Sequence, residues 1–298
     1  MGIVVGEELL LEMKLRTKTL GTLLTVSVIL CGAIFGLQWA SGQSPIAATT
    51  RSFEPLEELV YEAEFNRSLL RGLNVAELKF RSSRTPIAQA DKQHSTPYTL
   101  TLNADISSKG FFTRLFNLNF REQVESTVEP TSFTILKTTI LDEQGKRVRH
   151  TETFYDRSKG EMSWTLRDPN NLQSQPRTIV TEFTGQLQDV LSAIYFLRIQ
   201  QLRVGKPFEM FIGDGGRVYR IPVKVLEKKK MKTVLGKVNT LRLEPELFGP
   251  DRIIDEEKGE FNLWVTDDER HIPVSARIKT DYGTFDIKLK RVSNNPAK

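Results

Sequence analysis

The stretch FNLWVTDDERHIPVSARI, from Phe261 to Ile278, shows the pattern that decides the fold. Apolar residues alternate with polar ones on both sides of the tetrapeptide DDER. A period of two is typical of half-buried β-strands, and a polar cluster between two such runs predicts a β-hairpin. Aspartate at a turn accepts hydrogen bonds from nearby backbone amides, which explains Asp267 and Asp268 without catalysis. We interpret this cluster, with His271 beside it, as a turn in water and not as an active site.

The same alternation recurs along most of the chain. It is found in ELVYEAEF, NVAELKF, YTLTLNADI, SFTILKTTI, RHTETFYD, GRVYRIPVKVL, VNTLRLEP and GTFDIKLKRV. Many short strands in succession predict a mainly β protein, either an antiparallel β-sandwich or a barrel or half-barrel. Pro222 falls inside GRVYRIPVKVL, and proline is confined to edge strands or bulges. It therefore marks a candidate edge at which a partner strand could pair.

Two stretches depart from this alternation. TGQLQDVLSAIYFLRIQQL has apolar residues at helical spacing, with Thr184 as a candidate N-cap and with Gly205 and Pro207 beyond its end. It predicts one helix around residues 185–202, packed against the sheet. The second stretch, GFFTRLFNLNF, fits either a short helix or a strand. Its four phenylalanines pack as core or, if exposed, form an apolar ligand-binding patch: Phe111, Phe112, Phe116 and Phe120.

The N-terminal residues predict export. A basic segment, MKLRTK, precedes the apolar run Leu20–Trp39 and the small residues ASGQS. This order indicates a secretory signal peptide or an N-terminal membrane anchor within residues 1–43, with translation expected to begin at Met13. In both cases the chain beyond Arg51 is exported, to the periplasm or the outer face of the inner membrane. We expect a flexible leader at 44–55 and a single β-rich domain at 56–298, which meets the membrane only through an uncleaved N-terminal segment.

The residue inventory argues against several kinds of chemistry. Cys31 is the single cysteine, so the exported part lacks thiolate nucleophiles and thiolate metal ligands. His150 and Glu152 share a strand face, but the chain's other two histidines offer no obvious third ligand. GDGG (213–216) lacks the lysine of a phosphate loop and predicts a hairpin turn, and EKKKMK (227–232) predicts a solvated hairpin. We expect no catalytic residues, no metal and no cofactor. The net charge of +5 is weak evidence for nucleic acid.

Several motifs, taken in order, resemble an exported bacterial family of unknown function, domain-of-unknown-function family 3108. They are LEELVYEAEFNRSLLRGLNVAELKF, DVLSAIYFLR, GKPFEMFIGDGGRVYRIPVKV, TVLGKVNTLRLEP and FNLWVTDDERHIPV. The resemblance implies a signal peptide and a mostly antiparallel β-fold, and it carries over no catalytic residues. LWVTDDERHIPV is also similar, more faintly, to the late hairpin of half-barrel carriers of lipoproteins in the periplasm, a likeness of fold alone.

These observations favour a non-enzymatic cell-envelope protein that holds an apolar ligand, such as a lipid or acyl chain, or an envelope partner on a curved β-sheet. The alternative is an assembly factor that binds another envelope protein by edge-strand pairing. A hydrolase of envelope polymers is the least favoured function, because it requires an enclosed pair of carboxylates.

Overall fold

The structure is a computed structural model, and it describes residues 56–68, 70–87, 97–110, 119–171 and 173–294. The expected signal or anchor, the leader, and Phe111, Phe112 and Phe116 lie outside these ranges. In the described part, no helix has the length and apolar character needed to cross a membrane.

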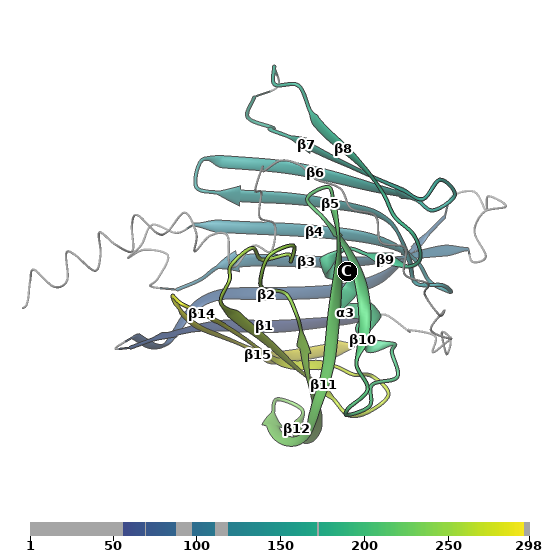
Figure 1. Ribbon diagram of the computed structural model, residues 1–298. Coiled ribbons are helices and arrows are strands. Elements are labelled where there is room, and N and C mark those ends of the chain that lie inside the picture. The colour runs from purple at the N-terminus through teal and green to yellow at the C-terminus, as the bar shows by residue number, and fades with distance from the viewer. Residues whose placement is uncertain (1–55, 69, 88–96, 111–118, 172, 295–298) are drawn as a thin grey trace, which may run out of the picture.

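One curved sheet of 15 strands, with a single helix, makes up the described fold (Figure 1). The strand order is β8-β7-β6-β5-β4-β3-β2-β1-β15-β14-β13-β12-β11-β10-β9, so the sheet is not closed on itself. Neighbouring strands are antiparallel except β9 and β10, which are parallel. The elements are β1 (Glu57–Arg67), β2 (Leu70–Pro86), β3 (Tyr98–Ser108), β4 (Phe120–Glu129), β5 (Thr134–Gln144), β6 (Arg147–Asp156), β7 (Glu161–Arg167), β8 (Arg177–Glu182), β9 (Leu187–Gln188), α3 (Val190–Arg198), β10 (Phe208–Asp214), β11 (Arg217–Thr233), β12 (Gly236–Pro245), β13 (Gly259–Thr266), β14 (Pro273–Thr280) and β15 (Gly283–Asn294).

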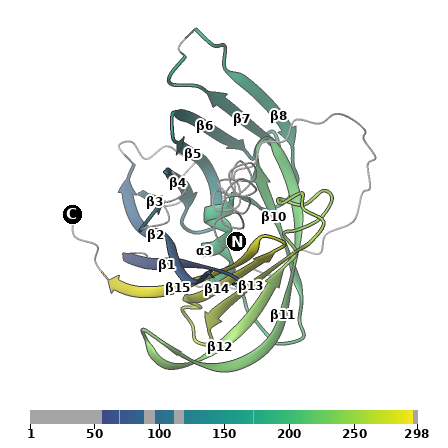
Figure 2. The ribbon, with the colours of Figure 1, turned by 90° about the vertical axis from the view of Figure 1, so that its left-hand side faces the viewer.

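The predicted mainly β fold with one packed helix is confirmed. Figure 2 shows the sheet curling around α3, which lies inside the curve against β3, β4, β9 and β10. The helix is shorter than residues 185–202, and its N-cap is Asp189 instead of Thr184. The difference arises because Leu187 and Gln188 pair with Phe211 and Ile212 as strand β9.

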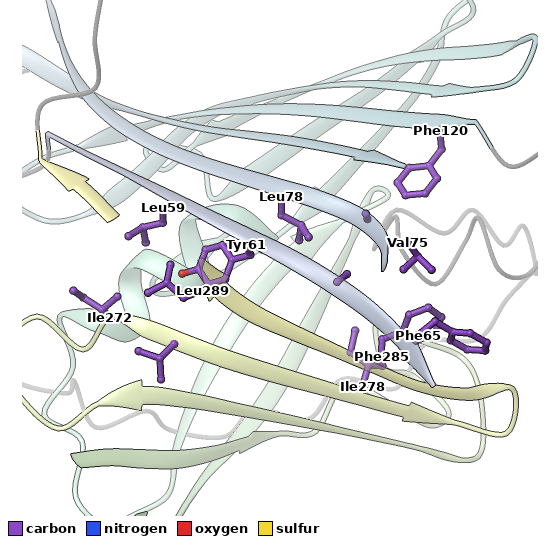
Figure 3. Packing of buried hydrophobic residues seen from close by; sticks show 13 residues of the cluster. Leu59, Tyr61, Phe65, Val75, Leu78, Phe120, Ile272, Ile278, Phe285 and Leu289 are labelled. Carbon is purple, nitrogen blue, oxygen red and sulfur yellow. The ribbon is translucent and has the colours of Figure 1, made fainter. Parts of the chain in front are cut away.

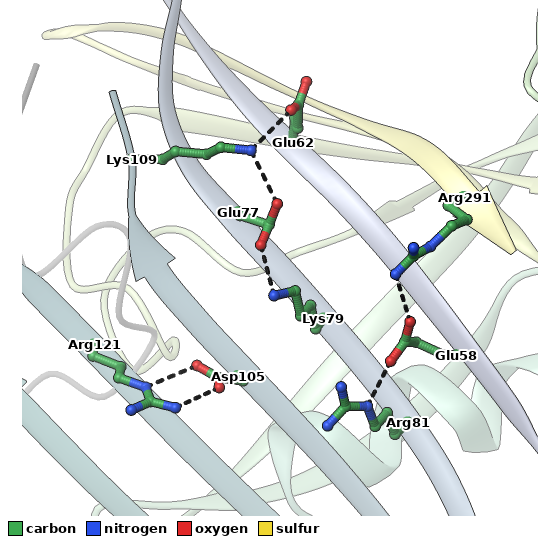
Figure 4. Close-up of polar contacts among 9 residues, drawn as sticks. All are labelled: Glu58, Glu62, Glu77, Lys79, Arg81, Asp105, Lys109, Arg121 and Arg291. Atoms are coloured by element: carbon green, nitrogen blue, oxygen red, sulfur yellow. Dashed lines mark hydrogen bonds and ion pairs between the residues drawn. The ribbon is translucent and has the colours of Figure 1, made fainter. Parts of the chain in front are cut away.

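Alternation assigns each strand an inner and an outer face. On β1 the inner residues Leu59, Tyr61, Ala63 and Phe65 are buried, and they pack in a core cluster with β2, β14 and β15 (Figure 3). On the outer face, charges are paired across strands (Figure 4). Glu58, for example, accepts from Arg81 on β2 at 2.6 Å and from Arg291 on β15 at 2.8 Å. The largely apolar inner face and the charged outer face explain why the sheet curves around its core.

The helix joins two further core clusters. Ala193 and Leu197 pack with buried residues of β10–β13, whereas Leu191 and Tyr195 pack with buried residues of β3–β7. Two opposite faces of α3 are therefore used, one for each half of the curved sheet. The helix fills the space that the open curl would otherwise leave exposed.

A buried ion pair fixes the C-terminal end of α3. Arg198 is 3% exposed and Glu57, at the start of β1, is 6% exposed. The two side chains form a two-pronged contact, with Nη2 of Arg198 donating to Oε2 of Glu57 at 3.2 Å. Nε of Arg198 donates to the backbone carbonyl of Arg270 at 3.1 Å, and His271 Nδ1 donates to the carbonyl of Arg198 at 2.9 Å.

The DDER segment forms the turn that the sequence predicts. The Oδ1 atom of Asp268 accepts from the backbone amides of Arg270 at 3.1 Å and of His271 at 3.2 Å. The turn is less solvated than expected, because His271 is 6% exposed and contacts the end of α3. The acidic cluster therefore has a structural role at the junction between the β13–β14 hairpin and the helix.

The prediction that Pro222 marks a sheet edge is wrong. Pro222 lies in β11, between β10 and β12, and is in register with Glu209 of β10. Its carbonyl accepts from the amide of Glu246 at 2.9 Å, just past the last β11–β12 pair, Val223 with Pro245. The nitrogen and carbonyl of a strand residue point to the same side. The missing N–H therefore faces the end of the ladder with β12, where a proline is tolerated inside the sheet.

We predict that replacement of Arg198 by methionine lowers the free energy of unfolding by about 3–5 kcal/mol, because the buried Glu57 loses its hydrogen-bonded partner and keeps only the longer contact with Arg270, at 3.6 Å. The double variant Glu57→Gln/Arg198→Met should lose less than the sum of the two single variants. Urea unfolding measures both effects.

Arg121→Met is the matched control. It breaks the two-pronged contact with Asp105 on the outer face, where the arginine side chain is 48% exposed, and it should cost no more than about 1 kcal/mol. Equal losses for Arg198→Met and Arg121→Met would contradict the structural role of the buried pair.

Candidate functional site

The candidate site is the concave face of strands β4–β7, on the same side of the sheet as α3. On β4 the inward positions are Glu122, Val124, Ser126 and Val128, and each is in register with a residue of the next strand. Three rows of side chains result, running across the strands. We call them the acidic and basic row (Glu122, Asp142 and Arg149), the apolar row (Val124, Ile140, Thr151 and Leu166) and the hydroxyl row (Ser126, Thr138 and Thr153, ending at Trp164).

The hydroxyl row holds the beginning of α3. The hydroxyls of Ser126 and Thr138 donate to the carboxylate of Asp189, which also accepts from the amide of Ser192 at 2.6 Å as the helix N-cap. In return, the hydroxyl of Ser192 accepts from the backbone amide of Asp189 at 3.0 Å. The reciprocal arrangement is a capping box, which stabilises the first turn of the helix. This buried aspartate therefore has a complete structural explanation.

Glu122 in the first row lacks such an explanation. Its side chain is 5% exposed, and its Oε2 atom has no hydrogen-bond partner among the described residues. Burial, reinforced by the nearby charges of Asp142 and Asp214, raises the pKa of Glu122 from 4.5 to about 8. The carboxyl of Glu122 is therefore mainly neutral at pH 7, and it presents an acid group to the interior of the curl.

Asp142, the cross-strand partner of Glu122, is held by neighbouring donors. It accepts from Gln144 Nε2 at 3.1 Å and from Arg147 Nη2 at 3.3 Å. On its other side it is in register with Arg149, whose pKa is lowered by burial and by the nearby charge of Arg147. The two adjacent carboxyls thus have different surroundings in the described chain, because Oε2 of Glu122 has no donor and Asp142 accepts from two side chains.

A hairpin from the other half of the sheet reaches this face. The GDGG turn between β10 and β11 lies against β6–β8, where the Thr181 hydroxyl donates to the carbonyl of Gly216 at 2.6 Å. A Cβ at Gly216 would lie 2.9 Å from the Cβ of Ile179, and Gly216 has a φ of +80°, so glycine is needed for this approach. The segment is the turn that the sequence predicts, but it is packed inside the curl.

Asp214, in the same turn, brings a further carboxyl to the interior. Its carboxyl is packed among protein atoms, although the residue as a whole is only half-buried. Burial, with the nearby charge of Asp189, raises the pKa of Asp214 to about 7. The same two causes raise the pKa of Tyr155 on β6 well above its usual value. The interior therefore favours neutral acids and disfavours additional negative charge.

The other residues singled out in the sequence do not assemble into a site. Phe120 is 6% exposed and packs in the core cluster of β1, β2, β14 and β15, so it is a core residue. His150 and Glu152 lie on the outer face of β6, where Glu152 pairs with Lys137 at 2.9 Å. Within the described ranges, no three histidine, cysteine or acidic side chains are arranged to hold a metal ion.

Sequence reasoning missed Glu122, Asp142 and Asp214. A signal for Glu122 exists in FREQVESTVE, because Glu122 shares the period-two phase of Phe120, Val124 and Val128. An acidic residue in the apolar phase of a strand is a candidate for a buried functional group. Asp214 had no such signal, because GDGG fits an ordinary turn.

We predict that Glu122→Gln changes the pH dependence of stability. A raised folded-state pKa means that the folded protein binds the extra proton between pH 4.5 and about 8. The stabilisation is fully present below pH 4.5 and is lost as the pH rises through about 8. Glutamine has no such proton, so the stability of the variant relative to the original protein should rise by roughly 2–4 kcal/mol from about pH 5 to about pH 9.

Urea unfolding at the two pH values measures this difference. Glu125→Gln, on the exposed outer face of the same strand, is the control, and it should show little relative change. If the difference in unfolding free energy between Glu122→Gln and the original protein is the same at both pH values, Glu122 is ionised in the folded protein at neutral pH.

Comparisons with known proteins give one similar solved structure and one family. A solved structure described as the "Crystal Structure of Beta-barrel-like Protein of Domain of Unknown Function DUF1849 from Brucella abortus" matches with a TM-score of 0.49 and 11% identity, over 80% of this chain and 97% of that chain. No curated protein matches the sequence. The profile of DUF3108, described as a protein of unknown function, matches residues 60–290. The chain therefore belongs to the DUF3108 family.

Proposed function

We propose that the protein is a non-catalytic binding protein of the cell envelope, and that it holds an elongated ligand, mainly apolar, against the concave face of β4–β7. The observation that carries this proposal is the apolar row. Val124, Ile140, Thr151 and Leu166 point inward but are only half-buried, whereas the hydroxyl row beside them is largely covered. Apolar surface that the described residues leave half-covered on an inner face is suited to an apolar ligand.

The acidic and basic row supports a polar end on this ligand. Glu122 lies next to the apolar row and offers a buried carboxyl oxygen without a partner in the described chain. A buried polar atom without a hydrogen bond is costly, and a ligand that donates to it recovers that cost. Because the carboxyl is mainly neutral at pH 7, it also tolerates an apolar chain beside it. The ligand class is thus an acyl chain or lipid with a hydrogen-bonding end.

A hydrolase is less well supported, although Glu122 and Asp142 do form an enclosed carboxyl pair of the kind such an enzyme needs. The two side chains are 5% and 6% exposed. In a hydrolase, a polymer and a water molecule must both reach the catalytic carboxyls in each turnover. A binding protein needs only to enclose the end of its ligand. The burial of the pair therefore favours binding over turnover.

Pairing with a strand of an envelope partner is a second candidate function. We propose β8 as its site, in place of Pro222. This strand pairs only with β7 among the described elements, and Val180 on it is 59% exposed. A free edge with an exposed apolar residue is suited to pairing with a strand of an envelope partner. Photo-crosslinking from position 180 in cells that yields only the protein itself would argue against this candidate.

We expect an apolar fluorophore with a fatty acyl chain to bind the purified protein, and native mass spectrometry after mild extraction to detect a co-purifying lipid. Thr151→Trp places an indole on the concave face between Ile140 and Leu166, and it should weaken fluorophore binding by about tenfold or more.

His150→Trp is the matched control. It places the same side chain on the outer face of the same strand and should leave the affinity within about twofold. If the original protein neither binds the fluorophore nor carries a lipid, the proposed function is wrong. If both variants bind equally, the ligand lies elsewhere in the protein.

A further inference from the structure

The β11–β12 hairpin extends beyond the sheet as a two-stranded arm, defined here as residues 229–239. Strand β10 pairs with β11 only as far as Val223, and β13 pairs with β12 only from Thr240 to Leu243. Beyond its base, where Lys229 pairs with Thr240 and Asn239 accepts from the amide of Asp267, the arm pairs with itself, up to Thr233 with Gly236. Figure 1 shows the hairpin at the lower end of the molecule, away from the candidate site on β4–β7.

The tip of the arm is apolar and exposed. Val234 is 51% exposed and Leu235 is 36% exposed. Within the described ranges, these are the only large exposed hydrophobic residues that are adjacent in the sequence. Behind them, Met231 and Val238 are directly opposite each other and half-buried. Met231 and Val238 therefore form an apolar pair behind the apolar tip, on a face that Lys229 shares at the base of the arm.

The other face of the arm is basic. Lys230, Lys232 and Lys237 share it, because Lys232 is directly opposite Lys237 and Lys230 is two residues away on the same strand. All three are exposed, and no acidic side chain lies within ion-pair distance of them in the described chain. Residues 228–239 contain no acidic residue at all. Like charges directly opposite on a hairpin repel each other.

The outer face around β1, β2 and β15 differs from the arm. On β1, β2 and β15, lysines contact glutamates of neighbouring strands, as Lys109 contacts both Glu62 at 3.3 Å and Glu77 at 3.0 Å (Figure 4). Lys288 likewise contacts Glu64 at 2.7 Å. The arm thus concentrates positive charge that the protein does not neutralise and places it beside two exposed apolar side chains.

We propose that this arm docks the protein on an anionic lipid bilayer. Val234 and Leu235 enter the interface between headgroups and acyl chains, and the three lysines contact the phosphates. Apolar residues beside several lysines are the combination that binds anionic membranes, by burial and by electrostatic attraction together. Nucleic acid or an acidic protein would account for the lysines but leave the apolar tip exposed. The surface is separate from the ligand site and does not depend on it.

The test uses the full-length chain with Leu235→Cys, in a Cys31→Ser background, labelled with an environment-sensitive fluorophore. We expect the emission to shift to shorter wavelength with vesicles of phosphatidylcholine and phosphatidylglycerol in equal parts, but not with phosphatidylcholine alone. A label at Val180→Cys, on the exposed edge of β8, should not respond. The N-terminal residues are the same in both labelled proteins, so the comparison isolates the arm.

The charge variant Lys230→Gln/Lys232→Gln/Lys237→Gln should require on the order of 100-fold more anionic lipid for the same shift, since each lysine near such a surface contributes about fivefold. The control Lys146→Gln/Lys206→Gln/Lys279→Gln removes the same charge from other exposed lysines and should change little. Equal binding by the two triple variants would overturn the proposal. So would charge-dependent binding to heparin or DNA with no spectral shift at position 235 on anionic vesicles.

Discussion

The arrangement of this protein depends on the buried contact between Arg198 and Glu57. These residues are 141 positions apart, and they join the end of α3 to the first strand, at the middle of the sheet order. A buried charge pair is weak evidence for stability, since its desolvation offsets much of its attraction. Here the pair mainly fixes the position of the helix, because Arg198 also donates to the carbonyl of Arg270 and lies 5.4 Å from the ring centre of Tyr195. The pair specifies where the helix lies inside the curl.

The position of the helix in turn determines which parts of the concave face are covered. Its capping aspartate uses the hydroxyl row, and its two apolar faces complete the core clusters on either side. The apolar row and Glu122 lie beyond this contact. The inner surface is therefore divided into a structural part, where Ser126 and Thr138 donate to Asp189, and a second part with half-covered apolar side chains and a carboxyl oxygen that has no partner in the described chain. Polar atoms that a protein leaves unsatisfied inside its core are candidates for function.

The outer surface shows a similar division. Most of its charges are matched across neighbouring strands, which limits the field that the protein presents to its surroundings. The arm differs in placing three lysines without an ion pair in the described chain beside an apolar tip, and it projects beyond the sheet. Together, the two proposals describe a protein that takes up a lipid-like ligand on a face inside the curl and docks on a membrane through a basic arm outside it.

The sequence by itself determined the secondary structure and the fold class. Period-two alternation predicted the strands around DDER and GDGG, and helical spacing predicted the one helix, because these patterns follow from which face of each element is buried. Tertiary structure alone decided the strand order, the position of β11 inside the sheet, and the meeting of Asp214 with Glu122 and Asp189. These depend on contacts between residues distant in the chain, and the residues at each position carry no local mark of their partner. Burial of Glu122, and with it the raised pKa, likewise follows from the curvature of the whole sheet and not from the strand that contains it.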